Sequence, residues 1–223
     1  MEKQTMEILE KKLTFWKHLT EQETKLLTGQ LYEEMIPKGG QVHRAQEQCK
    51  GLIFVLSGQL RVYVISEEGR EVTLYRIREG ETCVLSASCL LEAIAFDVFI
   101  EAVEETKVAV IPSVALNSVM KENPYVELFL NKSATERFSD VMWTMQQILF
   151  MRTDQRVAHF LWDEMVQRKS MEIRLTHDEI ARYIGSAREV VTKVVKYFAQ
   201  EGIVSLGRGK IEIIDKEKLG RLL

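Results

Sequence analysis

The sequence predicts an α+β fold in three consecutive parts: a run of short strands, one long helix, and two short helices followed by a β-hairpin. Glycine-punctuated apolar segments fill the chain between Lys38 and Pro112, which is typical of short strands joined by turns. No Gly or Pro occurs from Tyr125 to Ile184, as expected of long helices. Two helix-start patterns then flank Gly185. We expect domain boundaries that divide the chain into residues 1–122, 123–150 and 151–223.

The first part is predicted to be a β-roll. Its apolar segments predict strands at residues 52–56, 60–65, 72–77, 97–101 and 107–111. In the second of these, Leu60, Val62 and Val64 alternate with other residues, which is the pattern of a half-buried strand. Strands about 8–12 residues apart with turn signals between them are typical of a barrel or a double-sheet jelly roll.

The long helix is predicted to begin at Asn123-Pro124, because Asn is a good cap and Pro fits the first helical position. An apolar seam follows at spacings of four and three residues, formed by Ala134, Phe138, Val141, Met145 and Ile148. Such a seam either packs on its own domain or pairs with a second copy of the helix. Trp143, Leu149 and Phe150 lie off the seam, so we expect one face to contact the roll and another to form a dimer.

Composition excludes disordered, collagen-like and low-complexity proteins. Of the 223 residues, 46% are hydrophobic and 28% charged, as in ordinary globular proteins. Three cysteines cannot form a closed disulfide framework, and the first residues do not resemble a signal peptide, so we expect a cytoplasmic protein without a membrane partner. The formal net charge of −3 hides an asymmetry, because residues 151–223 are net basic and the preceding residues net acidic.

The most specific pattern lies between Leu175 and Lys196. Thr176 with Glu179 and Ser186 with Glu189 are two predicted capping boxes, each opening a helix. Gly185 between them allows the positive φ of a tight turn between crossed helices. This arrangement predicts a helix-turn-helix. The outward positions of its second helix are Arg188, Glu189, Thr192, Lys193 and Lys196.

A β-hairpin is predicted directly after the helix-turn-helix. Residues 202–206 and 211–214 are apolar segments on either side of Gly207-Arg208-Gly209-Lys210. This basic tip is suited to lie along a phosphate backbone, as the wing of a winged helix-turn-helix.

In this order and at this length, the roll, the long helix and the winged helix-turn-helix resemble the Crp–Fnr superfamily of bacterial transcription regulators. Residues 185–191, Gly-Ser-Ala-Arg-Glu-Val-Val, are similar to the family's turn and recognition-helix start. The resemblance implies a cyclic-nucleotide-binding-like roll that senses an effector. It also implies a homodimer that binds a pseudo-palindromic site in double-stranded DNA, and RNA polymerase as a partner if the protein is an activator.

The resemblance also implies which residues contact DNA. Arg188 and Glu189 would contact base edges, while Thr176 and His177 would contact phosphates. Glu189 has a second interpretation, as the acid of a capping box only. Lys193 replaces a frequent Arg of the family, so its contact should be less specific or go to phosphate. The full set is Thr176, His177, Ser186, Arg188, Glu189, Thr192, Lys193, Arg208 and Lys210.

The effector of the roll is not identified by the sequence. Gly80-Glu81 matches the start of the family's phosphate cassette, but Phe96-Asp97 aligns with its Arg-Ser pair, and no Lys or Arg occurs between Thr82 and Ile100. Val141 and Met142 replace hydroxyl side chains that hold adenine in relatives. Cyclic AMP is therefore disfavoured, because a buried phosphate would be unpaired.

The cofactor is unknown as well. A 4Fe-4S cluster needs four thiolates, and the chain has only Cys49, Cys83 and Cys89. Haem and a small apolar ligand stay open. Cys83 and Cys89 are either core residues or redox or nitric-oxide sensors. The candidate effector pocket consists of Gly80, Glu81, Cys83, Cys89 and Met142.

Two other functions are alternatives to DNA binding. An enzyme built on the roll needs convergent ligands, and His43 is the one histidine among the predicted strands, so we expect no enzyme, no catalytic residues and no metal site. The other alternative is a ligand-gated interaction module whose helix-turn-helix contacts protein.

Overall fold

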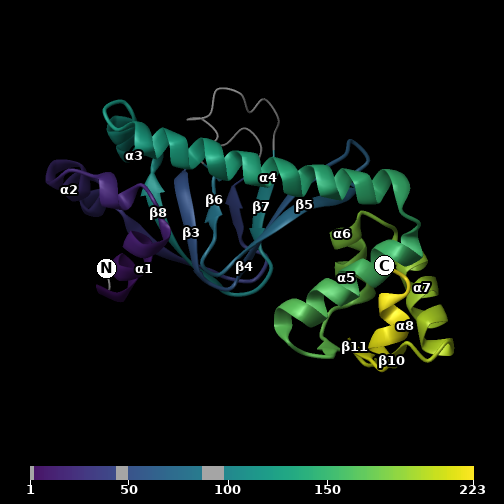
Figure 1. The fold of residues 1–223 in the computed structure, drawn as a ribbon. Helices are drawn as coiled ribbons and strands as arrows, with labels where there is room; N and C mark the ends of the chain where they lie inside the picture. The colour runs from purple at the N-terminus through teal and green to yellow at the C-terminus, as the bar shows by residue number, and fades with distance from the viewer. Residues whose placement is uncertain (1–2, 44–49, 87–97) are drawn as a thin grey trace. The chain divides into compact units, whose positions relative to one another are not determined.

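The computed structural model describes residues 3–43, 50–86 and 98–223 (Figure 1). The chain divides into two compact units. One consists of residues 1–64 and 74–141, and the other of residues 65–73 and 142–223. None of the described helices is long and apolar enough to cross a membrane.

The predicted β-roll is confirmed. Up to α3, the chain forms α1 (Lys3–Lys12), η1 (Trp16–His18), α2 (Glu21–Gln30), β1 (Tyr32–Ile36), β2 (Gln41–His43), β3 (Gly51–Ser57), β4 (Gln59–Ile65), β5 (Glu71–Arg78), β6 (Thr82–Cys83), β7 (Phe99–Ala102), β8 (Thr106–Pro112) and α3 (Ser113–Met120). Within the described residues of the roll, two four-stranded sheets have the orders β1-β8-β3-β6 and β2-β7-β4-β5. Strand β3 is antiparallel to β8, with Ile53 opposite Val110, and β4 is antiparallel to β7, with Val62 opposite Ile100. These four side chains are fully buried and belong to one apolar cluster that both sheets share.

Strand β4 corrects one prediction. It is not half-buried, because Leu60 to Tyr63 are all buried. Arg61 is only 1% exposed, and its Nη2 lies 2.8 Å from Oε1 of Glu101 on β7. The guanidinium also lies 4.0 Å from the centre of the Tyr63 ring. An ion pair with a neighbouring strand therefore allows a charged residue to be buried on the second face of the sheet.

Helix α4 (Pro124–Phe150) begins where the sequence predicts. The Asn123 side chain accepts a hydrogen bond from the backbone N–H of Tyr125 at 3.1 Å. Val126 and Leu130 are fully buried against the α1–α3 side of the roll. Of the predicted seam, Ala134 and Val141 pack against roll clusters, whereas Phe138 is 63% exposed. The other exposed apolar side chains of the helix include Met145, Ile148, Leu149 and Phe150.

The second unit contains the predicted winged helix-turn-helix. Its elements are α5 (Thr153–Arg168), β9 (Glu172–Ile173), α6 (His177–Ile184), α7 (Arg188–Gln200), β10 (Val204–Gly207), β11 (Lys210–Ile213) and α8 (Lys216–Gly220). The three strands form an antiparallel sheet in the order β10-β11-β9. Ile180, Val191, Val195 and Phe198 are fully buried in the core beneath the helices.

Candidate nucleic-acid interface

The first helix of the motif starts at a capping box, as predicted. Thr176 Oγ1 accepts a hydrogen bond from the backbone N–H of Glu179 at 3.1 Å. In return, Glu179 Oε2 accepts from the backbone N–H of Thr176 at 2.8 Å. The two bonds satisfy backbone donors that a helix start leaves unpaired. Thr176 and His177 are thereby held in defined positions at the beginning of α6.

The turn confirms the prediction for Gly185 and corrects that for Ser186. Gly185 has φ +62°, the left-handed conformation that ends α6. The backbone N–H of Ser186 bonds to the carbonyl oxygen of Ala181 at 2.9 Å, so Ser186 completes the C-terminal cap of α6. Helix α7 starts one residue later, with Ala187 as its N-cap and no side-chain cap hydrogen bond. The predicted Ser186–Glu189 capping box is therefore wrong.

Helix α7 has one apolar face and one charged face. Val191 and Val195 are fully buried against α5 and α6. Arg188, Glu189 and Lys193 are exposed on the other side of the helix. Lys196 extends this exposed face by nearly one turn. Such a helix can present long side chains to the edges of bases and to phosphates while its other face anchors it.

His177 connects the two helices. Its Nδ1 lies 3.0 Å from Oγ1 of Thr192 on α7. The Thr192 hydroxyl also donates a hydrogen bond to the carbonyl oxygen of Arg188 at 2.9 Å. Partial burial, followed by the positive charges of Arg188 and Lys196, lowers the pKa of His177 from its usual value.

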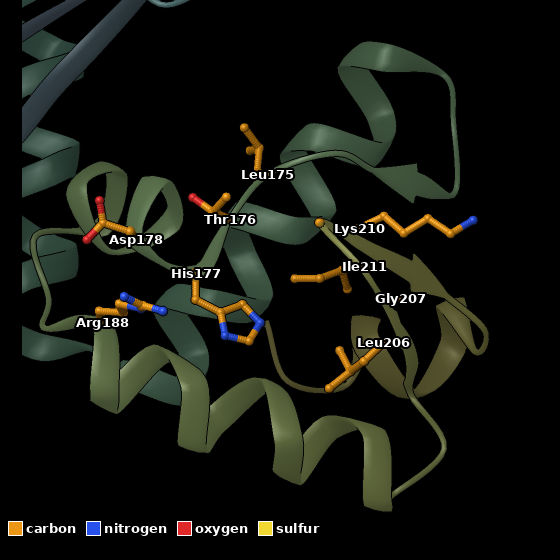
Figure 2. A pocket seen from close by; sticks show the side chains of 10 residues that line it. Leu175, Thr176, His177, Asp178, Arg188, Leu206, Gly207, Lys210 and Ile211 are labelled. Carbon is orange, nitrogen blue, oxygen red and sulfur yellow. The ribbon is translucent and has the colours of Figure 1, made fainter.

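A groove of about 570 Å³ lies between the start of α6, the first turn of α7 and the wing (Figure 2). It is lined by Leu175, Thr176, His177, Asp178, Arg188, Leu206, Gly207, Gly209, Lys210 and Ile211. It thus brings together four of the predicted DNA-contacting residues, from both helices and the wing. Ser186, Glu189, Thr192, Lys193 and Arg208 do not line it. The sequence does not single out Asp178 or Leu206 as site residues. Asp178 lies inside the predicted capping box without being one of its two members, and Leu206 is an apolar residue of the hairpin.

The wing carries two exposed cations, Arg208 and Lys210, and Lys210 is paired with a carboxylate. Lys210 Nζ lies 2.6 Å from Oε2 of Glu172 on β9, and this hydrogen bond raises the pKa of Lys210. Arg208 is exposed at the tip of the hairpin, between Gly207 and Gly209. The pair with Glu172 fixes the wing against β9, while Arg208 extends into solvent.

The candidate effector pocket is only partly described. Gly80 has φ +82°, and Glu81 Oε2 accepts from the backbone N–H of Arg78 at 3.0 Å. Arg137 of α4 lies 3.6 Å from Glu81 and 2.9 Å from Asp140. Cys89, Phe96 and Asp97 lie outside the described residues, and Met142 belongs to the other compact unit.

Cys83 is fully buried in the apolar cluster of the roll. Burial raises the pKa of its thiol, although hydrogen bonds with Ser86 act in the opposite direction. A buried thiol that stays protonated is a poor nucleophile.

Comparison with known proteins matches both parts of the chain. Residues 33–123 match the cyclic nucleotide-binding domain, and residues 155–222 match the Crp-like helix-turn-helix domain. The transcriptional regulator SdrP of Thermus thermophilus is 29% identical over 176 residues, which are 75% of this chain and 81% of that protein. The cyclic AMP receptor protein of the same organism is 25% identical over 195 residues, covering 87% and 89% of the two chains.

Solved structures of similar proteins share the fold of this chain. FixK2 from Bradyrhizobium japonicum shares the fold, with a TM-score of 0.70, 19% identity, and coverage of 86% of this chain and 96% of that one. A crp/fnr family protein from Eubacterium rectale has a TM-score of 0.91 and 41% identity, with 96% of this chain and 99% of that chain covered. This protein therefore belongs to the Crp–Fnr family of transcription regulators.

Proposed function

We propose that the protein is a homodimer that binds a pseudo-palindromic site in double-stranded DNA and regulates transcription in response to an effector in its roll. The observation that carries this proposal is the charged face of α7. Arg188, Glu189, Lys193 and Lys196 are exposed there while Val191 and Val195 anchor the helix from behind. The groove beside them is lined by further donors that suit phosphate.

The structure supports a division of roles among these residues. We assign to Arg188 a contact with guanine through two donors, and to Glu189 the acceptance of a hydrogen bond from a cytosine amino group. Because Ser186 is not the cap of α7, Glu189 has no capping-box partner, which favours base contact. We assign phosphate contacts to Thr176, His177, Ser186, Lys193, Arg208 and Lys210. Thr192 is assigned a supporting role in the DNA-contacting set, because its hydroxyl lies 3.0 Å from Nδ1 of His177.

We propose that α4 forms the dimer interface. Phe138 is 63% exposed and Phe150 81% exposed, with Met145, Ile148 and Leu149 also exposed between them. Exposed apolar groups at this density usually contact a second chain. A two-fold dimer presents two recognition helices about 34 Å apart, one helical turn of DNA.

We propose that the effector is not cyclic AMP. Arg137 of α4 already contacts the carboxylates of Glu81 in the roll and of Asp140 on its own helix, so a nucleotide phosphate would compete with both. Haem, a redox signal sensed through Cys89 and a small apolar ligand remain the alternatives, whereas the buried thiol of Cys83 favours a core role.

We propose that the chain divides functionally into residues 1–122, 123–150 and 151–223. We also propose a cytoplasmic location, and RNA polymerase as the partner if the protein is an activator.

Selection of bound sequences from a randomised duplex library tests this function. We expect an enriched pseudo-palindrome for the native protein. Arg188→Ala should lose about 1–3 kcal/mol of binding free energy and relax one base position in each half-site. Arg221→Ala, which removes the same charge from an exposed position outside the groove, is the matched control and should select the native motif. No enrichment by the native protein would refute the proposal.

The mass of the protein in solution tests the dimer separately. One chain has a mass of 25.8 kDa, and light scattering should give twice that value. A monomer at micromolar concentration would contradict the assignment of α4. Phe138→Glu should shift the native dimer towards monomer, because it places a charge in the apolar face.

A further inference from the structure

We propose that His177 takes up a proton when DNA binds, so that the DNA affinity of this protein rises as the pH falls. This inference rests on the proposed DNA-binding function and concerns one residue of the same groove. Figure 2 shows the His177 side chain projecting into the groove, with Arg188 on one side and Leu206 on the other.

The hydrogen bonds of Thr192 determine which nitrogen of the His177 ring is basic. A threonine hydroxyl has one hydrogen, and Thr192 donates it to the carbonyl oxygen of Arg188 at 2.9 Å. At the 3.0 Å contact with His177, the Thr192 oxygen is therefore the acceptor and Nδ1 of the imidazole is the donor. The neutral ring carries its proton on Nδ1, which leaves Nε2 as an acceptor. In that state Nε2 cannot donate a hydrogen bond to a phosphate.

The surroundings of His177 oppose a positive charge while DNA is absent. Partial burial and the charges of Arg188 and Lys196 on α7 lower its pKa. His177 is also the first residue of α6, where the helix dipole disfavours cations.

The other charged groups nearby have partners of their own. On α6, Asp178 lies 3.6 Å from Arg182, and Glu179 is bonded to Thr176. On the wing, Lys210 is paired with Glu172 of β9. Each of these carboxylates already has a partner. The charges that act on the imidazole are therefore mainly the positive ones of Arg188 and Lys196.

Phosphate reverses this balance. A phosphate in the groove offsets the repulsion from Arg188 and Lys196 and offers an acceptor to a proton on Nε2. The pKa of His177 must then be higher in the complex than in the free protein. By linkage, binding takes up a proton between the two pKa values, and a rise of one unit corresponds to a tenfold rise in affinity for each protomer.

Anisotropy of a rhodamine-labelled, random-sequence duplex provides the test, with the full-length protein at fixed ionic strength between about pH 5.5 and 8.5. We expect the affinity to fall as the pH rises through the bound-state pKa, by about tenfold or more over the range. His177→Gln should flatten this profile. His18→Gln, a matched substitution in the roll unit, should retain it.

NMR titration of the His177 ring gives a readout that does not depend on affinity. We expect the Nδ1–H tautomer in the free protein and a higher pKa in the complex. Equal pKa values in the two states, or parallel affinity profiles for the native protein and His177→Gln, would overturn the proposal. If the duplex binds with a steep salt dependence but no pH dependence, only this inference fails. If no duplex binds at any pH, the proposed function itself fails.

Discussion

Arg156 donates a hydrogen bond of 2.8 Å from Nη1 to the carbonyl oxygen of Ile184, the last residue of α6. Arg156 is only 9% exposed, and Nη2 also contacts Oγ1 of Thr153 at 3.3 Å. The carbonyl groups at a helix end lack partners within the helix. The guanidinium therefore supplies a partner for the end of α6 and links α5 to the turn that precedes the recognition helix.

Replacing Arg156 by Met should reduce the free energy of unfolding by about 1–3 kcal/mol, because the Ile184 carbonyl loses a charged donor. The methionine side chain keeps most of the volume, so the loss reports mainly on the hydrogen bond. Urea unfolding measures it. Arg174→Met, at a side chain that is 81% exposed, is the control and should change stability by less than about 0.5 kcal/mol. Equal effects of the two substitutions would contradict this role.

The two predicted caps should respond differently to the same change. Thr176→Ala removes the acceptor for the Glu179 backbone N–H and should cost about 1 kcal/mol of stability. Ser186→Ala removes no cap hydrogen bond, because Ala187 is the N-cap of α7, and should be close to neutral. Thermal unfolding of both variants checks the assignment. A larger loss for Ser186→Ala would restore the capping box that the sequence predicts.

These differences show which features local sequence patterns can predict. The positions of β3, β4 and β5 follow from apolar runs and adjacent glycines, and the start of α4 follows from Asn123-Pro124. Ser186 shows the limit, since its pattern fits a capping box while its backbone N–H completes the preceding helix end.

Contacts between segments that are distant in the sequence cannot be predicted from local patterns. The burial of Arg61 depends on Glu101 of another strand, and no pattern around Arg61 indicates that partner. Helices α1 and α2 precede Lys38, where no element is predicted, because they acquire their stability from packing Leu9 and Leu27 into a cluster with residues of α3 and α4. The groove likewise requires Leu206 of the wing to lie beside α6.

Glu101→Gln should destabilise the roll strongly. It removes the charge that lies 2.8 Å from the buried guanidinium of Arg61, and breaking a buried pair from one side costs about 3–5 kcal/mol. The free energy of urea unfolding measures the loss. In the half-exposed pair of Lys50 and Glu34, Glu34→Gln should cost less than about 1 kcal/mol. Similar values for both variants would show that burial of Arg61 does not depend on the pair.

The Cys83 thiol should be unreactive in the folded protein. Burial raises its pKa, so the reactive thiolate is scarce at neutral pH and forms mainly above the usual range of a cysteine. With Cys49 and Cys89 replaced by Ser, a colorimetric thiol reagent should label Cys83 only after denaturant is added. Rapid labelling of the native variant at pH 7 would identify Cys83 as an accessible sensor rather than a core residue.

The proposed binding of DNA phosphates by α7, the groove and the wing is best checked by the salt dependence of binding to a random-sequence duplex. A protein that makes six to ten phosphate contacts loses about 10³–10⁵ in affinity between about 50 and 200 mM salt, with a linear decline of log affinity against log salt. Two protomers that each use Arg188, Lys193 and Arg208 with the groove residues should fall within this range. An affinity that does not change with salt would refute phosphate binding by this domain and would favour a helix-turn-helix that contacts protein.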